Sequence, residues 1–379
     1  MIFDYETLRL IWWALLGALL IGFAITGGFD LGVAILLPFL GKNDTERRVI
    51  INSIGATWEG NQVWFVTAGG ALFAAWPMAY SVAFSGFYFA LLLTLFALFM
   101  RPIGFDYRSK LPSQRWRSNW DIALFVGGFI PALIFGVAFG NLLEGVPFHF
   151  DDEMRSFYTG SFWALLNPFA LLAGLISVSM LIMHGAVFLQ IKTVDAINQR
   201  CKQMVTVFAL ITMALFALAG IWIANINGYQ ITSEILPNAP SNPLTKIVTK
   251  GLGLWLANYA HYPVLWAIPG LAFIAGSATI ILSKIKRPGL AFISSSLTLT
   301  SVILTAGVSM FPFLMPSSSV MNSSLTVWDA SSSLTTLKIM FWVTMVFLPI
   351  IIIYTSWVFR VLRGKITQEH IHNNDHSAY

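Results

Sequence analysis

Long uncharged apolar runs, separated by short polar segments, dominate the pattern of the chain. A run of about 20 apolar residues can form a helix that crosses roughly 30 Å of hydrocarbon. The pattern predicts about nine such helices, near residues 8–40, 52–75, 79–101, 120–144, 160–190, 203–225, 262–284, 289–313 and 336–362. We therefore predict an all-α fold, a polytopic transmembrane bundle in which residues 1–379 form a single membrane domain.

The first run is longer than one crossing requires, and it contains Gly27 and Gly28 directly before Phe29 and Asp30. Adjacent glycines weaken a helix, so we expect a kink here or a division into two pieces.

Composition supports a membrane protein and excludes several other classes. Of the 379 residues, 57% are hydrophobic and only 10% are charged, whereas soluble domains carry about 25% charged residues. The net charge is +5, but the basic residues lie in short loops without interleaved aromatic residues, which argues against binding of nucleic acid. The single cysteine, Cys201, excludes an internal disulfide and a multi-cysteine metal site.

The charged residues of the loops orient the chain. Residues 101–117 carry five basic side chains and one acid, and the loops after the fifth, seventh and ninth predicted spans are also basic. Basic loops lie on the cytoplasmic side, so we predict the amino terminus outside and the tail 363–379 inside. The long connection 226–261 would then lie outside, and its residues 244–260 alternate apolar residues with lysines, which favours a helix lying on the outer membrane surface.

Two acidic residues, away from the ends of their predicted spans, stand out. An acid in the bilayer costs about 2.5–3.5 kcal/mol on insertion scales, so Asp30 and Glu59 are candidates for function. Glu59 is expected roughly 10 Å below the inner surface, and Asp30 approaches from the same side. We predict that both relay protons, and that Asp106, Lys110 and Tyr379 gather protons at the inner mouth of this route.

Glu59 lies in a polar and aromatic segment, 58–64, with Trp58, Asn61, Gln62 and Trp64. Consecutive polar positions within a span have to face protein or water rather than lipid. Glu59 can carry protons or can hydrogen-bond a neighbouring helix, and both interpretations stay open. For Asn61 and Gln62 we favour helix packing.

His184 is the only histidine well within a predicted span. One imidazole cannot supply both axial ligands of a b-type haem, so we expect a helix contact, and no haem or other metal ligated by this chain.

Seven segments together resemble subunit II of cytochrome bd-type quinol oxidases. They are residues 28–32 (GFDLG), 58–64 (WEGNQVW), 68–77 (AGGALFAAWP), 101–110 (RPIGFDYRSK), 140–148 (GNLLEGVPF), 311–318 (FPFLMPSS) and 324–330 (SLTVWDA). Their order and spacing run from the first span toward the carboxyl terminus, which makes the resemblance specific.

The resemblance implies a multi-pass protein of the bacterial inner membrane, one subunit of a quinol:oxygen oxidoreductase that is not catalytic alone. Haems b558, b595 and d would lie in subunit I. This chain would support subunit I and supply part of the cytoplasmic proton path while quinol is oxidised and dioxygen is reduced to water. A bound quinone, a small single-span accessory subunit, quinol and lipid are further expected partners.

The chain departs from the family pattern at Gly27, where aspartate is expected, at Thr57, where histidine is common, and at Glu59, where aspartate is usual. Without a carboxyl at residue 27, the proton route in the first span would depend on Asp30 alone or on water. The alternative is a secondary transporter, since carriers also have glycine-interrupted helices and midplane acids. Carriers usually show repeat-related halves, however, and only the first span is interrupted here.

Overall fold

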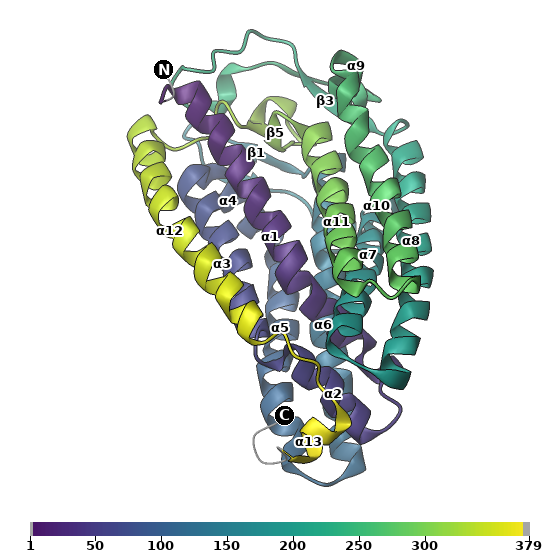
Figure 1. Ribbon diagram of the computed structural model, residues 1–379. Coiled ribbons are helices and arrows are strands. Elements are labelled where there is room, and N and C mark those ends of the chain that lie inside the picture. Colours follow the sequence, from purple (N-terminus) through teal and green to yellow (C-terminus); the bar gives the residue numbers. More distant parts are fainter. Residues whose placement is uncertain (1–2, 374–379) are drawn as a thin grey trace.

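The computed structural model describes residues 3–373 and is a bundle of long helices. The helices are α1 (Tyr5–Leu40), α2 (Asp44–Gly55), α3 (Trp58–Ala75), α4 (Pro77–Gly86), α5 (Tyr88–Tyr107), α6 (Gln114–Glu144), α7 (Pro168–Lys192), α8 (Asp195–Ile223), α9 (Ala257–His261), α10 (Ala267–Lys284), α11 (Pro288–Met310), α12 (Leu334–Val361) and α13 (Gln368–Asn373). Short 3-10 turns η1 to η6 span Arg108–Lys110, Trp163–Leu166, Pro243–Thr245, Leu254–Leu256, Pro263–Trp266 and Met321–Ser323. The predicted all-α membrane fold is confirmed (Figure 1).

Within residues 3–373, eight helices are long and apolar enough to cross a membrane, close to the nine predicted. The difference arises at the second predicted span, 52–75. Here the chain forms α2, which ends at Gly55, and then α3, whose first turns contain the polar residues Glu59, Asn61 and Gln62. The first span is not divided into two pieces, because α1 runs as one helix of 36 residues through Gly27 and Gly28.

Helix α7 forms the centre of the bundle, and almost all of its residues from Ser177 to Gln190 are buried. It packs against α1, α6, α8 and α11. The crossing with α1 is close because glycines meet there: a Cβ on Gly185 would lie 2.7 Å from the carbonyl carbon of Gly32. The last long helix, α12, lies along the side of the bundle with most of its side chains exposed (Figure 1).

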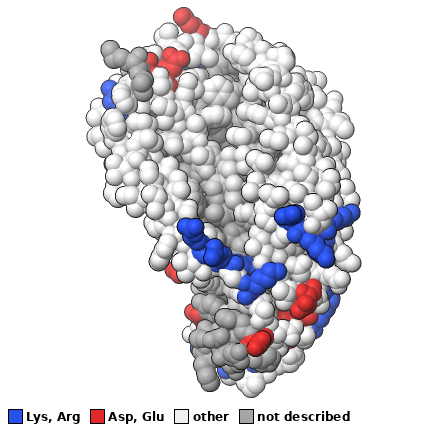
Figure 2. All heavy atoms as spheres, viewed as in Figure 1, with Lys and Arg blue, Asp and Glu red and all other residues white. Residues whose placement is uncertain are grey.

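The two ends of the bundle differ. The basic end, named here for its lysines and arginines, holds α2, η1, α13 and the turns after α7 and α10. Figure 2 shows most of the visible blue side chains gathered beneath a broad uncharged surface. The loop cap at the other end consists of residues 145–167, 224–266 and 311–333. Which end faces the cytoplasm stays a prediction from the loop charges.

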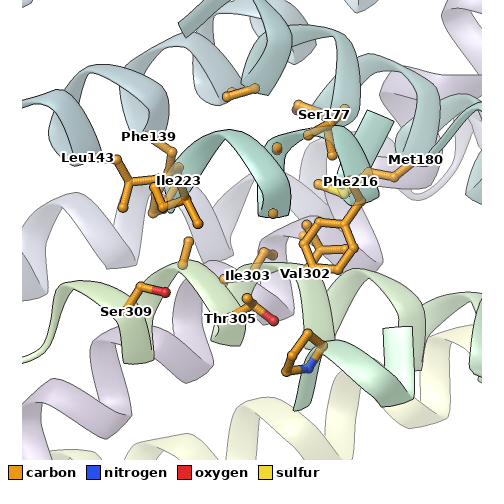
Figure 3. Close-up of a pocket in the computed structure, with 18 of the residues that line it drawn as sticks. Phe139, Leu143, Ser177, Met180, Phe216, Ile223, Val302, Ile303, Thr305 and Ser309 are labelled. Atoms are coloured by element: carbon orange, nitrogen blue, oxygen red, sulfur yellow. The ribbon is translucent and has the colours of Figure 1, made fainter. Parts of the chain in front are cut away.

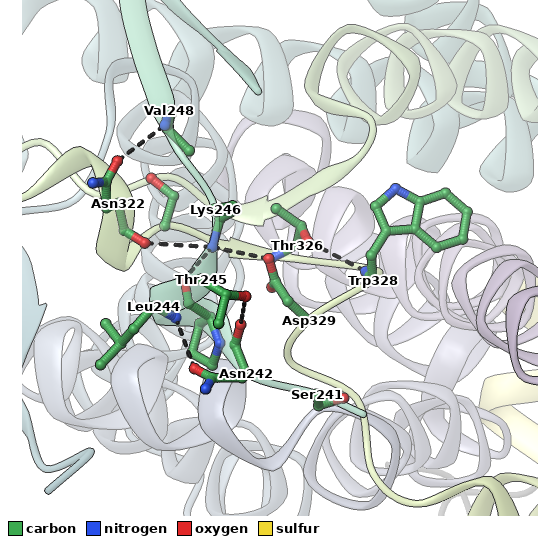
Figure 4. Close-up of polar contacts among 12 residues, drawn as sticks. Ser241, Asn242, Leu244, Thr245, Lys246, Val248, Asn322, Thr326, Trp328 and Asp329 are labelled. Atoms are coloured by element: carbon green, nitrogen blue, oxygen red, sulfur yellow. Dashed lines mark hydrogen bonds and ion pairs between the residues drawn. The ribbon is translucent and has the colours of Figure 1, made fainter. Parts of the chain in front are cut away.

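The loop cap contains three antiparallel hairpins and a buried ion pair. The strands are β1 (Phe148–Phe150) with β2 (Ser156–Tyr158), β3 (Asn227–Ile231) with β4 (Val248–Leu252), and β5 (Phe313–Met315) with β6 (Leu325–Thr326). Lys246 Nζ lies 2.9 Å from Asp329 Oδ2, and this ion pair joins two loops far apart in sequence (Figure 4). Lys246 Nζ also donates a hydrogen bond to the carbonyl of Pro243 (2.7 Å).

The prediction of an interfacial helix over 244–260 is wrong. This stretch holds η3, β4, η4 and only the start of α9. Lys246 turns inward to Asp329 instead of toward lipid headgroups, and the left-handed Gly253 (φ 70°) separates the strand from the following turn.

Candidate functional site

The acid of the first predicted span is fully buried in the bundle. Asp30 lies on α1 about 15 Å from the end of that helix at Leu40. Its Oδ2 accepts a hydrogen bond of 2.8 Å from Nδ2 of Asn61 on α3. Its Oδ1 has no hydrogen-bond partner among the residues that the structure describes.

Arg101 on α5 supplies the opposite charge. Its side chain is fully buried, and it interacts electrostatically with Asp30 without forming an ion pair within 4.0 Å. The guanidinium carbon lies 5.5 Å from the ring centroid of Trp58, but none of the three guanidinium nitrogens has a hydrogen-bond partner within residues 3–373. We call Asp30, Asn61, Trp58 and Arg101 the Asp30 cluster.

Buried polar groups are nearly always hydrogen-bonded, to protein or to ordered water. The Asp30 cluster offers one carboxylate oxygen and three guanidinium nitrogens without a partner among the described residues. These atoms therefore have hydrogen-bonding capacity to spare. A carboxyl, an amide and an arginine with such capacity within a membrane helix bundle can hold and pass a proton.

Glu59 lies outside this cluster. It was expected about two turns into a span, but it lies in the first turn of α3 and its side chain is exposed, while Asn61 two residues later faces Asp30. Exposed Val63 and Val66 continue the same face of α3. The segment 58–64 thus has a packed side and an open side.

The aromatic residues of the segment pack as expected of structural residues. The Trp58 ring lies 5.3 Å from that of Phe105, and Trp64 fills the space beside Gly22 of α1, where a Cβ would lie 2.6 Å from the indole. Gln62 is partly buried, and its Nε2 has no hydrogen-bond partner within residues 3–373.

The remaining predicted residues lie at the basic end. Asp106 is in the last turn of α5 and Lys110 is in η1, and both side chains are exposed. Tyr379 lies outside the described residues. The structure therefore brings Asp30, Asn61 and Trp58 together, and it leaves Glu59, Asp106 and Lys110 on the surface.

Sequence reasoning missed Arg101 and a second set of charges. Arg101 was counted with the basic loop 101–117, although it is buried within α5. At the basic end, the carboxylate of Asp121 on α6 forms ion pairs with Arg108 (2.5 Å) and Arg47 (2.7 Å). The carboxylate of Asp44 forms ion pairs with Arg108 (3.0 Å) and Arg117 (2.6 Å). We call these five residues the Asp121 network. No sequence signal distinguishes its members from ordinary loop charges.

His184 is fully buried in α7, as predicted for a helix contact. Its Nδ1 lies 2.8 Å from Ser295 Oγ, and its Nε2 lies 2.9 Å from the carbonyl oxygen of Ile25. Both ring nitrogens are engaged, so an iron ligand at His184 would have to displace one of these contacts. No group of three metal-ligating side chains occurs within the described part of the chain.

An apolar pocket of about 460 Å³ opens between α1, α6, α7, α8, α10 and α11. Phe139, Phe216 and Val302 are among the apolar side chains that line it, and the few polar ones include Ser177, Thr305 and Ser309 (Figure 3). Such a pocket suits a long hydrocarbon chain better than a polar substrate.

Residues 8–362 match the family model described as cytochrome bd terminal oxidase subunit II. The chain belongs to this family. It is 55% identical to Escherichia coli (strain K12) cytochrome bd-I ubiquinol oxidase subunit 2, over 99% of this chain and 100% of that protein. It is also 52% identical to a probable cytochrome oxidase subunit 2 of Haemophilus influenzae, again over 99% and 100% of the two chains.

A solved structure of bd oxidase from Geobacillus thermodenitrificans has the same fold. The TM-score is 0.68 at 16% identity, over 94% of this chain and 98% of the other. The resemblance stated from the sequence is confirmed, and the chain is a multi-pass subunit of a cytochrome bd oxidase, an oxidoreductase complex of the bacterial inner membrane. A subunit II implies a subunit I partner, and the carrier alternative has no support.

Proposed function

We propose that this chain is a non-haem-ligating subunit that supports the haem-bearing subunit I and carries part of the proton path for ubiquinol oxidation coupled to reduction of dioxygen to water. The observation that carries the proposal is the Asp30 cluster, a buried carboxyl and a buried guanidinium with unused hydrogen-bonding capacity inside the bundle.

The path begins at the basic end, where exposed Asp106 and Lys110 collect protons. Asp106 follows Arg101 by five residues on α5, a rise of about 7.5 Å, so surface and cluster lie on one helix. Water molecules bound by Arg101 and Asp30 carry the proton inward. Tyr379 belongs to the proposed entry as a prediction from the sequence alone.

Glu59 carries the proton out of this chain. Its exposed position on α3 would face lipid in an isolated subunit, at a cost of about 2.5–3.5 kcal/mol on insertion scales. Coverage by subunit I removes that cost and places the carboxyl at the boundary between the chains. The apolar side chains Val63 and Val66 on the same face support this docking.

The haems b558, b595 and d are assigned to subunit I, in line with the occupied ring nitrogens of His184. The apolar pocket between α1, α7 and α11 is the proposed place for the tail of a bound quinone. A small single-span accessory subunit stays a prediction from the family resemblance.

The decisive experiment measures quinol-driven oxygen consumption by the purified complex carrying Asp30→Asn or Glu59→Gln. Both substitutions keep shape and hydrogen bonding but cannot ionise, so we expect at least about a tenfold slower rate with unchanged haem spectra. The defect should grow at high pH, where protons are scarce. The matched control is Glu153→Gln, an exposed acid of the loop cap, which should leave the rate unchanged. A normal rate and normal pH dependence in both variants would assign these carboxyls to packing.

Orientation is tested separately. Reporter fusions after Lys365, at the basic end, and at Asp152, in the β1–β2 turn, should report opposite compartments, with Lys365 in the cytoplasm. Reporters in the same compartment would contradict the predicted topology and the direction of the path.

A further inference from the structure

A second pocket, of about 630 Å³, opens at the basic end. It forms where three distant segments meet: the start of α8 with Asp195 and Lys202, the α10–α11 turn with Lys286, and Lys365 after α12. We call it the lysine pocket. No residue proposed for the proton path lines it.

Polar contacts between the segments hold the walls of the lysine pocket. Lys365 Nζ donates to the carbonyl of Thr193 (3.4 Å), and Asn198 Nδ2 donates to the carbonyls of Gln190 (2.9 Å) and Thr193 (3.2 Å). The Gln190 amide also exchanges two hydrogen bonds with the hydroxyl of Ser283, at 2.8 and 3.1 Å. These contacts join α7, α8, α10 and the tail, so the pocket is part of the folded bundle.

The charge of the lysine pocket is positive and unbalanced. Three lysines, Lys202, Lys286 and Lys365, face one acid, Asp195, and none of the four forms an ion pair among the described residues. At the same end, Arg47, Arg108, Arg117 and Arg200 each pair with a carboxylate. The pocket lysines lack such a partner among the described residues, so their charge is free to meet an external anion.

The backbone adds to this preference for anions. The helices α8 and α11 both begin at the pocket, and their N-cap residues, Val194 and Arg287, make no side-chain hydrogen bond to the first turn. The free N–H groups and dipole of a helix amino terminus favour negative charge. Asp195 (φ 51°) and Lys286 (φ 60°) also hold left-handed backbone conformations, which non-glycine residues rarely adopt outside functional or tightly held sites.

We propose that the lysine pocket binds a phosphate-bearing anion, with the headgroup of an anionic membrane phospholipid as the favoured source. A phosphodiester presents several acceptor oxygens to lysine ammonium groups. The exposed apolar side chains Ile285 and Leu290 flank the α10–α11 turn and offer a surface for acyl chains. A free phosphate compound of the cytoplasm would satisfy the same polar groups without using these apolar side chains.

The test uses the purified oxidase complex, stripped of lipid in detergent and examined by native mass spectrometry. The complex is mixed with phosphatidylglycerol, with phosphatidylcholine or with inorganic phosphate. The variant Lys202→Gln/Lys286→Gln/Lys365→Gln removes the three ammonium groups. The matched control, Lys42→Gln/Arg115→Gln/Arg360→Gln, removes the same charge from exposed positions of the chain that do not line the pocket.

We expect one phosphatidylglycerol to be retained by the wild-type and control complexes. Each pocket lysine removed should weaken retention about fivefold, and all three together roughly a hundredfold. Phosphatidylcholine, which carries no net charge, should be retained much less. Inorganic phosphate that binds in a lysine-dependent way, while phosphatidylglycerol retention is independent of the lysines, would assign the pocket to a free phosphate compound. Equal retention of both probes by pocket variant and control would overturn the proposal.

A triple Lys→Arg variant guards against a folding defect. It keeps the charge and should keep the lipid, and haem spectra of every variant verify assembly of the complex. Loss of binding in the assembled arginine variant as well as in the glutamine variant would argue against charge recognition of phosphate and would equally overturn the proposal.

Discussion

The Asp121 network and the Asp30 cluster both contain buried charged side chains, but these side chains differ in how many hydrogen bonds they form. Asp121 accepts hydrogen bonds from Arg108, at 2.5 and 3.2 Å, and from Arg47, at 2.7 Å. Asp30 accepts one, from Asn61, and its counter-charge Arg101 donates none within residues 3–373.

We infer that this difference separates structural from functional charge. A carboxylate whose oxygens accept hydrogen bonds from two arginines fixes the elements that carry its partners. A buried carboxyl with spare hydrogen-bonding capacity can accept water and exchange a proton. We infer that the Asp121 network joins α2, η1 and α6 at the basic end, while the Asp30 cluster retains its under-paired charges for proton transfer.

The largest expected effect is on the Asp121 network. Asp121→Ala leaves Arg108, which is almost fully buried, without its main carboxylate, and breaking a buried ion pair costs about 3–5 kcal/mol of stability. Thermal unfolding of the purified complex should show a large drop in midpoint, and the assembled fraction should keep its turnover rate per haem.

The control is Asp151→Ala. Asp151 pairs with the exposed Arg155 in the loop cap, at 2.7 Å. Desolvation raises the pKa of the Asp151 carboxyl, but hydrogen bonds from Arg155 outweigh it and hold this pKa below the usual range. Exposed pairs contribute little, so its unfolding midpoint should hardly change. If the two variants were equally stable, the Asp121 network would lose its structural role.

The Asp30 cluster should respond in the opposite way. The double variant Asp30→Asn/Arg101→Met removes both charges, and replacing a buried pair by neutral groups is often neutral or stabilising by about 1–4 kcal/mol. We expect an unfolding midpoint equal to or above that of the wild type, together with strongly reduced oxygen consumption. Retained oxygen consumption would show that these two charged side chains have only a structural role.

These expectations also show where sequence reasoning succeeded and where it stopped. Apolar runs marked the membrane helices because span length and hydrophobicity are local properties. Asp30 was found because an acid in an apolar run is conspicuous. Arg101 was not, since it lies at the end of its run and looks like the first charge of a basic loop. Its burial depends on tertiary contacts, among them the one with the Trp58 ring of α3.

Glu59 and the Asp121 network show the same limit. The predicted depth of Glu59 assumed one helix over 52–75, but the chain breaks after Gly55, so the acid falls in a first turn. Asp121 pairs with arginines 13 and 74 residues away in sequence, which no periodicity reports. Tertiary packing decides which of many similar charges meet.

A smaller effect is expected at His184. This side chain resembles the Asp121 network in being satisfied, because both ring nitrogens have partners. His184→Ala leaves Ser295 and the carbonyl of Ile25 with fewer partners in the bundle, at a cost of about 1–3 kcal/mol. The dithionite-reduced spectrum should keep all haem signals. Loss of one signal from an assembled complex would place a haem ligand in this chain.

The smallest effect concerns Lys246, a buried cation that is paired like Asp121 yet lies in the loop cap. Burial lowers the pKa of its ammonium, and Asp329 opposes that shift. The unfolded chain therefore binds this proton more tightly than the folded chain, and the stability contributed by Lys246 rises with pH between its folded pKa and its unfolded value near 10.4. The unfolding midpoint of the wild type minus that of Lys246→Met should thus be higher at about pH 9.5 than at about pH 7. A difference that falls with pH would mean that the ion pair with Asp329 outweighs burial in setting the pKa of Lys246. Pairing in the loop cap would then hold its cation as firmly as the Asp121 network holds its carboxylate.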